Sequence, residues 1–199
     1  MILLDNGHGS DTPGKRSPVW SDGLYVQEWR YARMVVDGIA DGLERMGIPY
    51  AILVPEEKDV ALGERCRRAN RIAKRNGAHQ VLLISVHLNA SNVVNAASGW
   101  EIHTYKGTSA SDEYAKVFWN CAEEELGDRF PMRGDFIDAD PDWDSNFAIL
   151  RDTVCPAVLT ENLFMTNEKD CRFLMSDEGF KTIVDIHLKA IAKICGISG

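Results

Sequence analysis

The chain has 199 residues, 45% of them hydrophobic and 26% charged, and carries a formal net charge of −8. This length suits one domain with a sizeable core and makes two domains the less expected arrangement. The acidic balance argues against nucleic-acid binding, which depends on clustered Lys and Arg. No stretch approaches the roughly 20 apolar residues that cross a bilayer, so we expect no membrane insertion.

The cysteines and the N-terminus bear on the compartment. Five cysteines occur without a Cys-x-x-Cys pair, which favours reduced thiols over a disulfide framework. At the N-terminus, Asp5 interrupts the apolar residues before the apolar region of a secretory signal could form. We therefore expect synthesis in the cytoplasm, without a signal peptide of the chain's own.

Apolar runs alternate with segments of helical periodicity along the whole chain. In chain order the pattern predicts a strand at residues 2–4, a functional loop at 9–22, a helix at 24–46, a strand at 48–54, a helix at 61–75, a strand at 80–86, a half-buried strand at 99–105, a helix at 111–126, a long loop at 127–144, a strand pair around 147–150 and 156–161, and a helix at 177–195. Such alternation predicts a single α/β domain over residues 1–199, with a mostly parallel, twisted sheet and helices on both faces.

Three chemically capable side chains stand at the ends of predicted strands. His8 and His87 each follow an apolar run, and Glu161 closes a third. Because ligands of an open α/β sheet gather outside the carboxyl ends of its strands, these residues should converge there. A lone histidine is more often structural than a ligand, but two with the same placement favour a metal-dependent hydrolase.

A fourth candidate is Glu28, which shares its helix stripe with Ala32, Val35 and Ile39. A carboxylate on that apolar stripe is costly unless a cation compensates it. Two His and one Glu would form a zinc site with an open position for water, and the other Glu would then transfer protons. The plainer alternatives are a capping or surface ion-pair role for Glu28 and a structural salt bridge for Glu161.

The basic cluster, the remaining histidines and Cys155 have structural explanations. A basic cluster at residues 65–75 lies on an amphipathic helix and is interpreted as a solvated face rather than an anion site. His103 could face the cleft but fits a structural role better, and His79 and His187 are interpreted as packing or capping residues. Cys155 precedes a predicted strand and is interpreted as a buried, inert thiol.

The motifs together resemble the zinc-dependent N-acetylmuramoyl-L-alanine amidases, the family of cell-separation amidases and phage endolysins. The likeness covers nearly the whole chain and is carried by LDNGHG at residues 4–9, the helix with Glu28, Leu62 to Arg65, Ala69-Asn70, SVHLNA at 85–90, GWEI at 99–102, Leu150-Arg151, PAVLTE at 156–161 and FMTN at 164–167. Each motif alone is weak, but their order and spacing are specific.

The resemblance implies that His8, Glu28 and His87 hold Zn²⁺ and that Glu161 is the catalytic carboxylate. The chain departs from the family pattern at two places. Residues 54–57 replace a Thr-Arg pair, which puts a family arginine contact in doubt, and Leu163 stands where a glycine commonly follows the catalytic Glu by two. Neither departure removes an implied ligand.

The implied reaction is hydrolysis of the amide between the lactyl group of N-acetylmuramic acid and L-alanine in peptidoglycan. Asn89 and Arg151 lie next to motif residues and are candidates for substrate binding, with a positioning role equally open. The loop at 127–144, with its aspartates and Arg133, is a candidate wall of the substrate groove. We expect a monomer that acts at the cell wall after release or delivery by another factor.

Two other functions stay open at this stage. A zinc exopeptidase acting on peptide stems would use the same chemistry, because metal-assisted hydrolysis on a parallel sheet is not restricted to sugar-linked amides. A module that binds the cell wall without catalysing a reaction would need no metal-assisted chemistry. Identification of the released products would distinguish an exopeptidase from an amidase. Metal analysis of the purified protein would test the wall-binding module.

Overall fold

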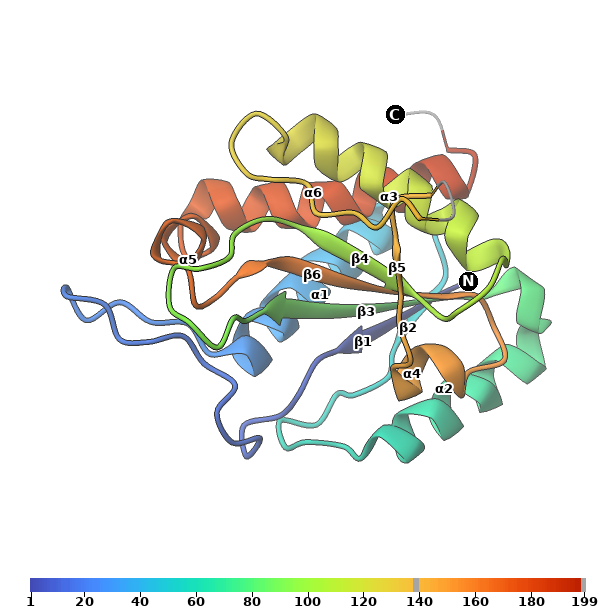
Figure 1. The fold of residues 1–199 in the computed structure, drawn as a ribbon. Helices are drawn as coiled ribbons and strands as arrows, with labels where there is room; N and C mark the ends of the chain where they lie inside the picture. The colour runs from blue at the N-terminus through green and yellow to red at the C-terminus, as the bar shows by residue number, and fades with distance from the viewer. Residues whose placement is uncertain (138–139, 198–199) are drawn as a thin grey trace.

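One sheet organises the chain (Figure 1). The computed structural model describes residues 1–137 and 140–197. Within these, six strands lie in the order β2-β1-β3-β6-β4-β5. They are β1 (Ile2–Asn6), β2 (Tyr50–Ile52), β3 (Leu82–Asn89), β4 (Glu101–Thr104), β5 (Trp143–Asp144) and β6 (Ala157–Phe164). Neighbours from β2 to β6 are parallel, β4 is antiparallel to β6, and β5 is parallel to β4. The mostly parallel α/β sheet is confirmed.

Helices cover both faces of this sheet, as Figure 1 shows. On one face lie α1 (Glu28–Met46), α3 (Ala110–Leu126), α5 (Glu168–Leu174) and α6 (Asp177–Ile194), and on the other lie α2 (Leu62–Asn76) and α4 (Ala148–Arg151). A 3-10 turn, η1 (Ala78–Gln80), leads into β3. Central strands covered on both sides need apolar residues in continuous runs, which explains the pattern in the sequence.

The alternation of side chains along each strand divides the core in two. Leu4 and Ile84 belong to the larger cluster beneath α1, α3 and α6, whereas Leu3 and Leu83 belong to the smaller one beneath α2 and α4. Leu3 pairs with Leu83 in register, and Leu83 pairs with Ala157. Residues in register share a face, so this row points toward α2 and α4. The same parity carries on to the strand ends.

Three predicted elements differ from the structure. Residues 24–27 are not helical, because residues 16–27 form a hairpin in which Ser17 N donates to Val26 O, and α1 begins only at Glu28. The predicted strand at 147–150 is wrong: the segment is α4, whose first turn closes when Arg151 N donates to Phe147 O. Strand β4 is buried along its whole length rather than half-buried, because helix α3 and β6 contact it.

The helix α5 has no counterpart among the predicted elements. Its seven residues are too few to show a helical period, and its N-terminus is set by Asn167, whose side chain accepts a hydrogen bond from Asp170 N. The other helices are found within a few residues of their predicted bounds. No helix in the described part of the chain combines the length and apolar character that a membrane crossing needs.

Candidate active site

Three predicted metal ligands meet at one point beyond the sheet. His8 follows β1, Glu28 is the first residue of α1, and His87 lies near the end of β3. His8 Nε2 is 3.3 Å and His87 Nδ1 3.0 Å from the same atom, Glu28 Oε1. The two imidazole rings stand edge to face, with centroids 5.1 Å apart. The strand ends therefore bring together residues that are up to 79 positions apart in the sequence.

This trio fits a divalent metal. Its ligand atoms all lie within 4.8 Å of one another, and no other His, Cys, Asp or Glu group of three among the described residues does so. Glu28 is buried, and its Oε2 atom has no hydrogen-bond partner in the described part of the chain. Such an orphaned carboxylate oxygen is costly unless a cation or another donor binds it. Two imidazoles and one carboxylate are also the donor set of catalytic zinc sites that keep a fourth position open.

The surroundings of Glu28 and His87 favour the charged form of each side chain. Burial by itself would raise the pKa of Glu28, but hydrogen bonds from His8 and His87, together with their charge, hold it below its ordinary value. Burial likewise opposes protonation of His87, yet its contact with Glu28 raises the pKa of the imidazole. In each case a nearby opposite charge outweighs desolvation. The site is thus built around a Glu28 carboxylate that stays ionised and attracts positive charge.

Two glycines beside His8 are required by close packing. A Cβ on Gly7 would lie 2.4 Å from His87 Cε1, and a Cβ on Gly9 would lie 1.9 Å from Asp59 N. The sharp turn itself falls on His8, whose φ is +60°. The two glycines therefore make room for the second imidazole and for the neighbouring loop.

Glu161 stands beside this centre on β6. It pairs in register with His87 on one side and with Glu101 on the other, so the three side chains emerge from the face that α2 and α4 cover. Burial raises the pKa of Glu161 to about 8, His87 opposes this increase, and the charges of Glu28 and Glu101 add to it. Glu161 Oε2 is buried and has no hydrogen-bond partner among the described residues.

A chain of polar contacts leads from His87 to helix α2. Ser85 Oγ lies 3.1 Å from His87 Nε2 and donates to Asp5 Oδ2 at 2.6 Å. Asp5 Oδ1 accepts from Arg65 at 2.7 Å. Arg65 also donates to the carbonyl oxygens of Asn6 and His8. The imidazole of His87 is thereby oriented by hydrogen bonds behind it.

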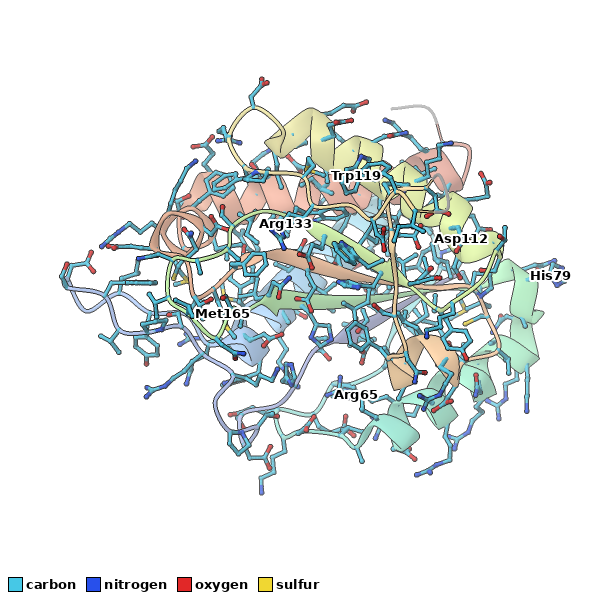
Figure 2. All side chains as sticks on the ribbon, viewed as in Figure 1. Arg65, His79, Asp112, Trp119, Arg133 and Met165 are labelled. Carbon is cyan, nitrogen blue, oxygen red and sulfur yellow. The ribbon has the colours of Figure 1, made fainter. Side chains whose placement is uncertain are left out.

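The interpretation of the whole basic cluster as a solvated face is wrong for one member. Arg65 is 2% exposed and lies between α2 and the chain that leaves β1, as Figure 2 shows. Arg67 and Arg71 on the same helix are exposed, in agreement with the prediction. The signal that sequence reasoning missed is the position of Arg65 on the apolar stripe of its helix, one residue before the buried Cys66.

A cavity of about 560 Å³ opens from this centre. His8, His87 and Glu161 line one end, and α2, α4 and the loop before α4 form the walls. Its remaining lining residues are Asp5, Lys15, Asp59, Val60, Leu62, Arg65, Asn146, Phe147, Ala148, Ile149, Arg151 and Leu159. The cavity lies at the carboxyl ends of parallel strands, where α/β folds bind their ligands.

The two residues proposed for substrate binding lie in different surroundings. Arg151 lines the cavity and makes two hydrogen bonds to the carboxylate of Asp152. Asn89 donates to Glu101 Oε2 at 2.8 Å and is not among the residues that line the cavity.

The predicted groove wall at 127–144 is not found where the structure describes that loop. Its backbone is tied to β4, since Arg133 N donates to Trp100 O and Ser145 N to Thr104 O at the loop's end. The Arg133 side chain donates to Glu101 at 2.6 Å. Residues 146–151, which follow the loop, form that wall instead. Residues 138–139 lie outside the described part.

The remaining candidates serve the scaffold. His103 is buried, lies 2.9 Å from Ser145 Oγ and does not line the cavity. Burial lowers the pKa of His187 to about 4, and its Nε2 lies 3.0 Å from Thr160 Oγ1. Burial raises the pKa of Cys155 to about 11, which makes its thiol a poor nucleophile. Figure 2 shows His79 well away from Arg65, on η1 just before β3 begins, and the residue is exposed.

Comparisons with known proteins agree with this geometry. A family model described as N-acetylmuramoyl-L-alanine amidase matches residues 2–193. The endolysin of Bacillus phage SPP1 is 28% identical, over 99% of this chain and 66% of the endolysin. The N-acetylmuramoyl-L-alanine amidase CwlM of Bacillus licheniformis is 27% identical, over 99% of this chain and 69% of CwlM. The chain thus spans about two thirds of the length of these relatives.

A solved structure shares the fold over its whole length. The N-acetylmuramoyl-L-alanine amidase from Clostridium difficile 630 superposes with a TM-score of 0.81 at 22% sequence identity, covering 100% of this chain and 97% of the other.

Proposed function

The chain belongs to the N-acetylmuramoyl-L-alanine amidase family, and we propose that it is a zinc-dependent enzyme that hydrolyses the amide bond between the lactyl group of N-acetylmuramic acid and L-alanine in peptidoglycan. The observation that carries this proposal is the sharing of Glu28 Oε1 by His8 and His87 at the mouth of a cavity that Glu161 also lines. Peptidoglycan is the substrate that family membership implies.

His8, Glu28 and His87 would hold the metal in this proposal. A bound zinc ion would act as a Lewis acid, which would lower the pKa of a water from 15.7 toward about 7 and polarise the scissile carbonyl. Ser85, fixed by Asp5, orients His87 for this task. Leu88 N donates to Glu28 Oε1 and helps to fix the carboxylate.

Glu161 is the general base and then the general acid. Its Oε2 atom lacks a partner among the described residues, so it is available to accept the proton of the attacking water. It then returns this proton to the leaving amine of L-alanine. A pKa of about 8 suits proton return, and the positive charge of a metal nearby would lower this pKa toward the value that proton acceptance needs.

Replacing Glu161 tests the assignment. We expect Glu161→Gln to bind zinc like the parent protein but to release peptide stems from purified sacculi about 10²- to 10⁴-fold more slowly, the range typical of a lost acid-base group. His87→Ala should lose both zinc and activity, whereas Glu113→Gln, on the exposed face of α3, should change neither. Mass spectrometry identifies the products. Full activity of Glu161→Gln, or release of single amino acids instead of whole stems, would contradict the proposal.

Two further parts of the proposal concern the setting. We infer that the chain acts as a monomer, because one copy contains the metal ligands, the acid and the cavity. The similarity to a phage endolysin supports action at the cell wall after release or delivery by another factor. Sedimentation of the purified protein tests the first of these inferences.

A further inference from the structure

One of the cavity's basic side chains has no bonded partner in the described part of the chain. Three basic side chains, Lys15, Arg65 and Arg151, line the cavity. Arg65 donates to the carboxylates of Asp5 and Asp59, and Arg151 donates twice to Asp152. Lys15 makes no side-chain hydrogen bond or ion pair with any residue in the described ranges 1–137 and 140–197.

The backbone holds Lys15 beside the catalytic centre. Its carbonyl oxygen accepts a hydrogen bond from Glu28 N at 3.0 Å, so it lies next to the first residue of α1. Arg16 then pairs with Gln27 in an antiparallel bridge, which starts the hairpin over residues 16–27. Lys15 is half-buried, and its charge acts on Glu161 across the cavity. Lys15 therefore belongs to the lining of the cavity rather than to the outer surface.

No carboxylate among the described residues of the cavity forms an ion pair with Lys15, although the charge of Glu161 reaches it. Val60, Leu62, Phe147, Ile149 and Leu159 provide an apolar lining, and the carboxylates of Asp5 and Asp59 are already bonded to Arg65. The acid nearest in function, Glu161, has its own task at the scissile bond. A partly desolvated ammonium in such surroundings is stabilised by an anionic group of the ligand.

The substrate of the proposed reaction carries an anion at a suitable place. The peptide stem continues from L-alanine to a glutamate, whose α-carboxylate is free in some peptidoglycans and amidated in others. Neighbouring residues of an extended chain are about 3.3–3.6 Å apart, so this carboxylate lies within one or two residue lengths of the scissile amide. A lysine with a flexible four-carbon stem can meet it as a point charge.

We propose that Lys15 binds the free carboxylate of the stem residue that follows L-alanine, and that it makes the enzyme prefer acidic stems over amidated ones. This inference rests on the proposed function, because it names a substrate class for the same site. An amide in place of the carboxylate removes the ionic part of the contact. Hydrogen bonds to charged groups contribute enough for a preference of roughly 10- to 100-fold.

The test compares two muramyl tripeptides that differ only in the free carboxylate or amide of the second stem residue. The zinc-loaded parent protein should cleave the acidic stem with about 10-fold or greater kcat/KM, mainly through a lower KM. Lys15→Met should lose this preference by weakening only the acidic stem, and Lys15→Arg should keep it. Lys74→Met, the same change on the exposed face of α2, should behave like the parent.

Other results would overturn the inference. Equal cleavage of both stems by the parent protein would do so while leaving the amidase assignment intact. An equal loss of kcat on both stems in Lys15→Met would mean that Lys15 acts on Glu161 and not on the substrate. Calorimetric binding of both tripeptides to the Glu161→Gln variant decides the question without turnover. Equal affinities there would refute the inference, and a preference for the acidic stem that Lys15→Met removes would support it even if the bond cleaved proves to be another one.

Discussion

At Leu163 the buried side chain and the backbone conformation have opposite effects on stability. It occupies the left-handed region with φ +66°, two residues after Glu161, and is fully buried. The family resemblance places a glycine at this position, and the backbone of Leu163 adopts a conformation that suits glycine. A left-handed residue with a Cβ costs roughly 1–2 kcal/mol, whereas removing a buried leucine side chain costs about 2–5 kcal/mol. Burial therefore outweighs strain, which explains how leucine is tolerated here.

This balance predicts an unusual order of stability. Leu163→Ala and Leu163→Gly should both be less stable than the parent protein, but the glycine variant should be the more stable of the two by about 1 kcal/mol, because only glycine relieves the strain. Urea unfolding measures the difference. At Ala115, a buried helical position with ordinary backbone, substitution by glycine should instead destabilise. An alanine variant at 163 that is more stable than the glycine variant would contradict the argument.

At the scale of elements, Arg65 joins helix α2 to the end of β1. Its partner Asp5 lies in the sheet with 1% of its surface exposed, and the pair is 2.7 Å apart. The arginine also binds backbone carbonyl oxygens of Asn6 and His8, so it fixes the turn that presents the first metal ligand. A buried charge pair of this kind contributes little net stability, but removing one partner leaves the other uncompensated.

Arg65→Met should accordingly destabilise the fold by about 3–5 kcal/mol. Adding Asp5→Asn should recover part of this loss, because the amide oxygen can still accept from Ser85 without a buried charge. The exposed neighbour Arg67→Met provides the control and should stay within about 0.5 kcal/mol of the parent. Denaturant unfolding of the parent protein, Arg65→Met, Asp5→Asn and the double variant forms a double-mutant cycle. An additive cycle, with no recovery in the double variant, would show that the pair is not coupled.

At the scale of the whole molecule, the metal trio connects parts that fold from different regions. His8 follows β1, and Glu28 begins α1 on one face of the sheet. His87 lies near the end of β3, in a row of side chains that points to the other face. A cation bound by all three would link both layers across the edge of the sheet. Binding to the folded state alone stabilises it by RT ln(1 + [L]/Kd), about 2.7 kcal/mol at a hundredfold excess over Kd.

Removing metal should therefore lower the melting temperature. For a chain of this size the expected decrease is roughly 5–10 °C between zinc-saturated and chelated protein. Calorimetry with and without chelator measures it, and His87→Ala should melt at one temperature in both conditions. Below about pH 5 the zinc-dependent difference should disappear, because protonated imidazoles cannot bind metal. Equal melting of the parent protein at pH 7 with and without zinc would argue against a metal bound by these ligands.

Much of this molecule is determined by short-range pattern. Apolar runs and helical periods suffice to predict the α/β sheet, both helical layers and the placement of His8, His87 and Glu161 toward the carboxyl ends of strands. The predicted ends of two strands are too early, because β3 continues to Asn89 and β6 to Phe164. The stripe of Ala32, Val35 and Ile39 likewise explains why Glu28 is buried. These features follow from the sequence because each depends on the period of one segment and on the general rule for strand ends.

Other features are decided only by the tertiary structure, because they depend on contacts between residues that are far apart in the sequence. Residues 147–150 are apolar enough for a strand, and their helical turn against α2 becomes evident only once the packing is known. The helical stripe indicates that Arg65 is buried, but its partner Asp5 is identified only by the tertiary structure. Lys15 becomes a candidate for substrate binding only because a hairpin closes beside Glu28. Local periodicity specifies which side of an element is buried, whereas the pairing of charges across a cavity is set by contacts between segments far apart in the chain.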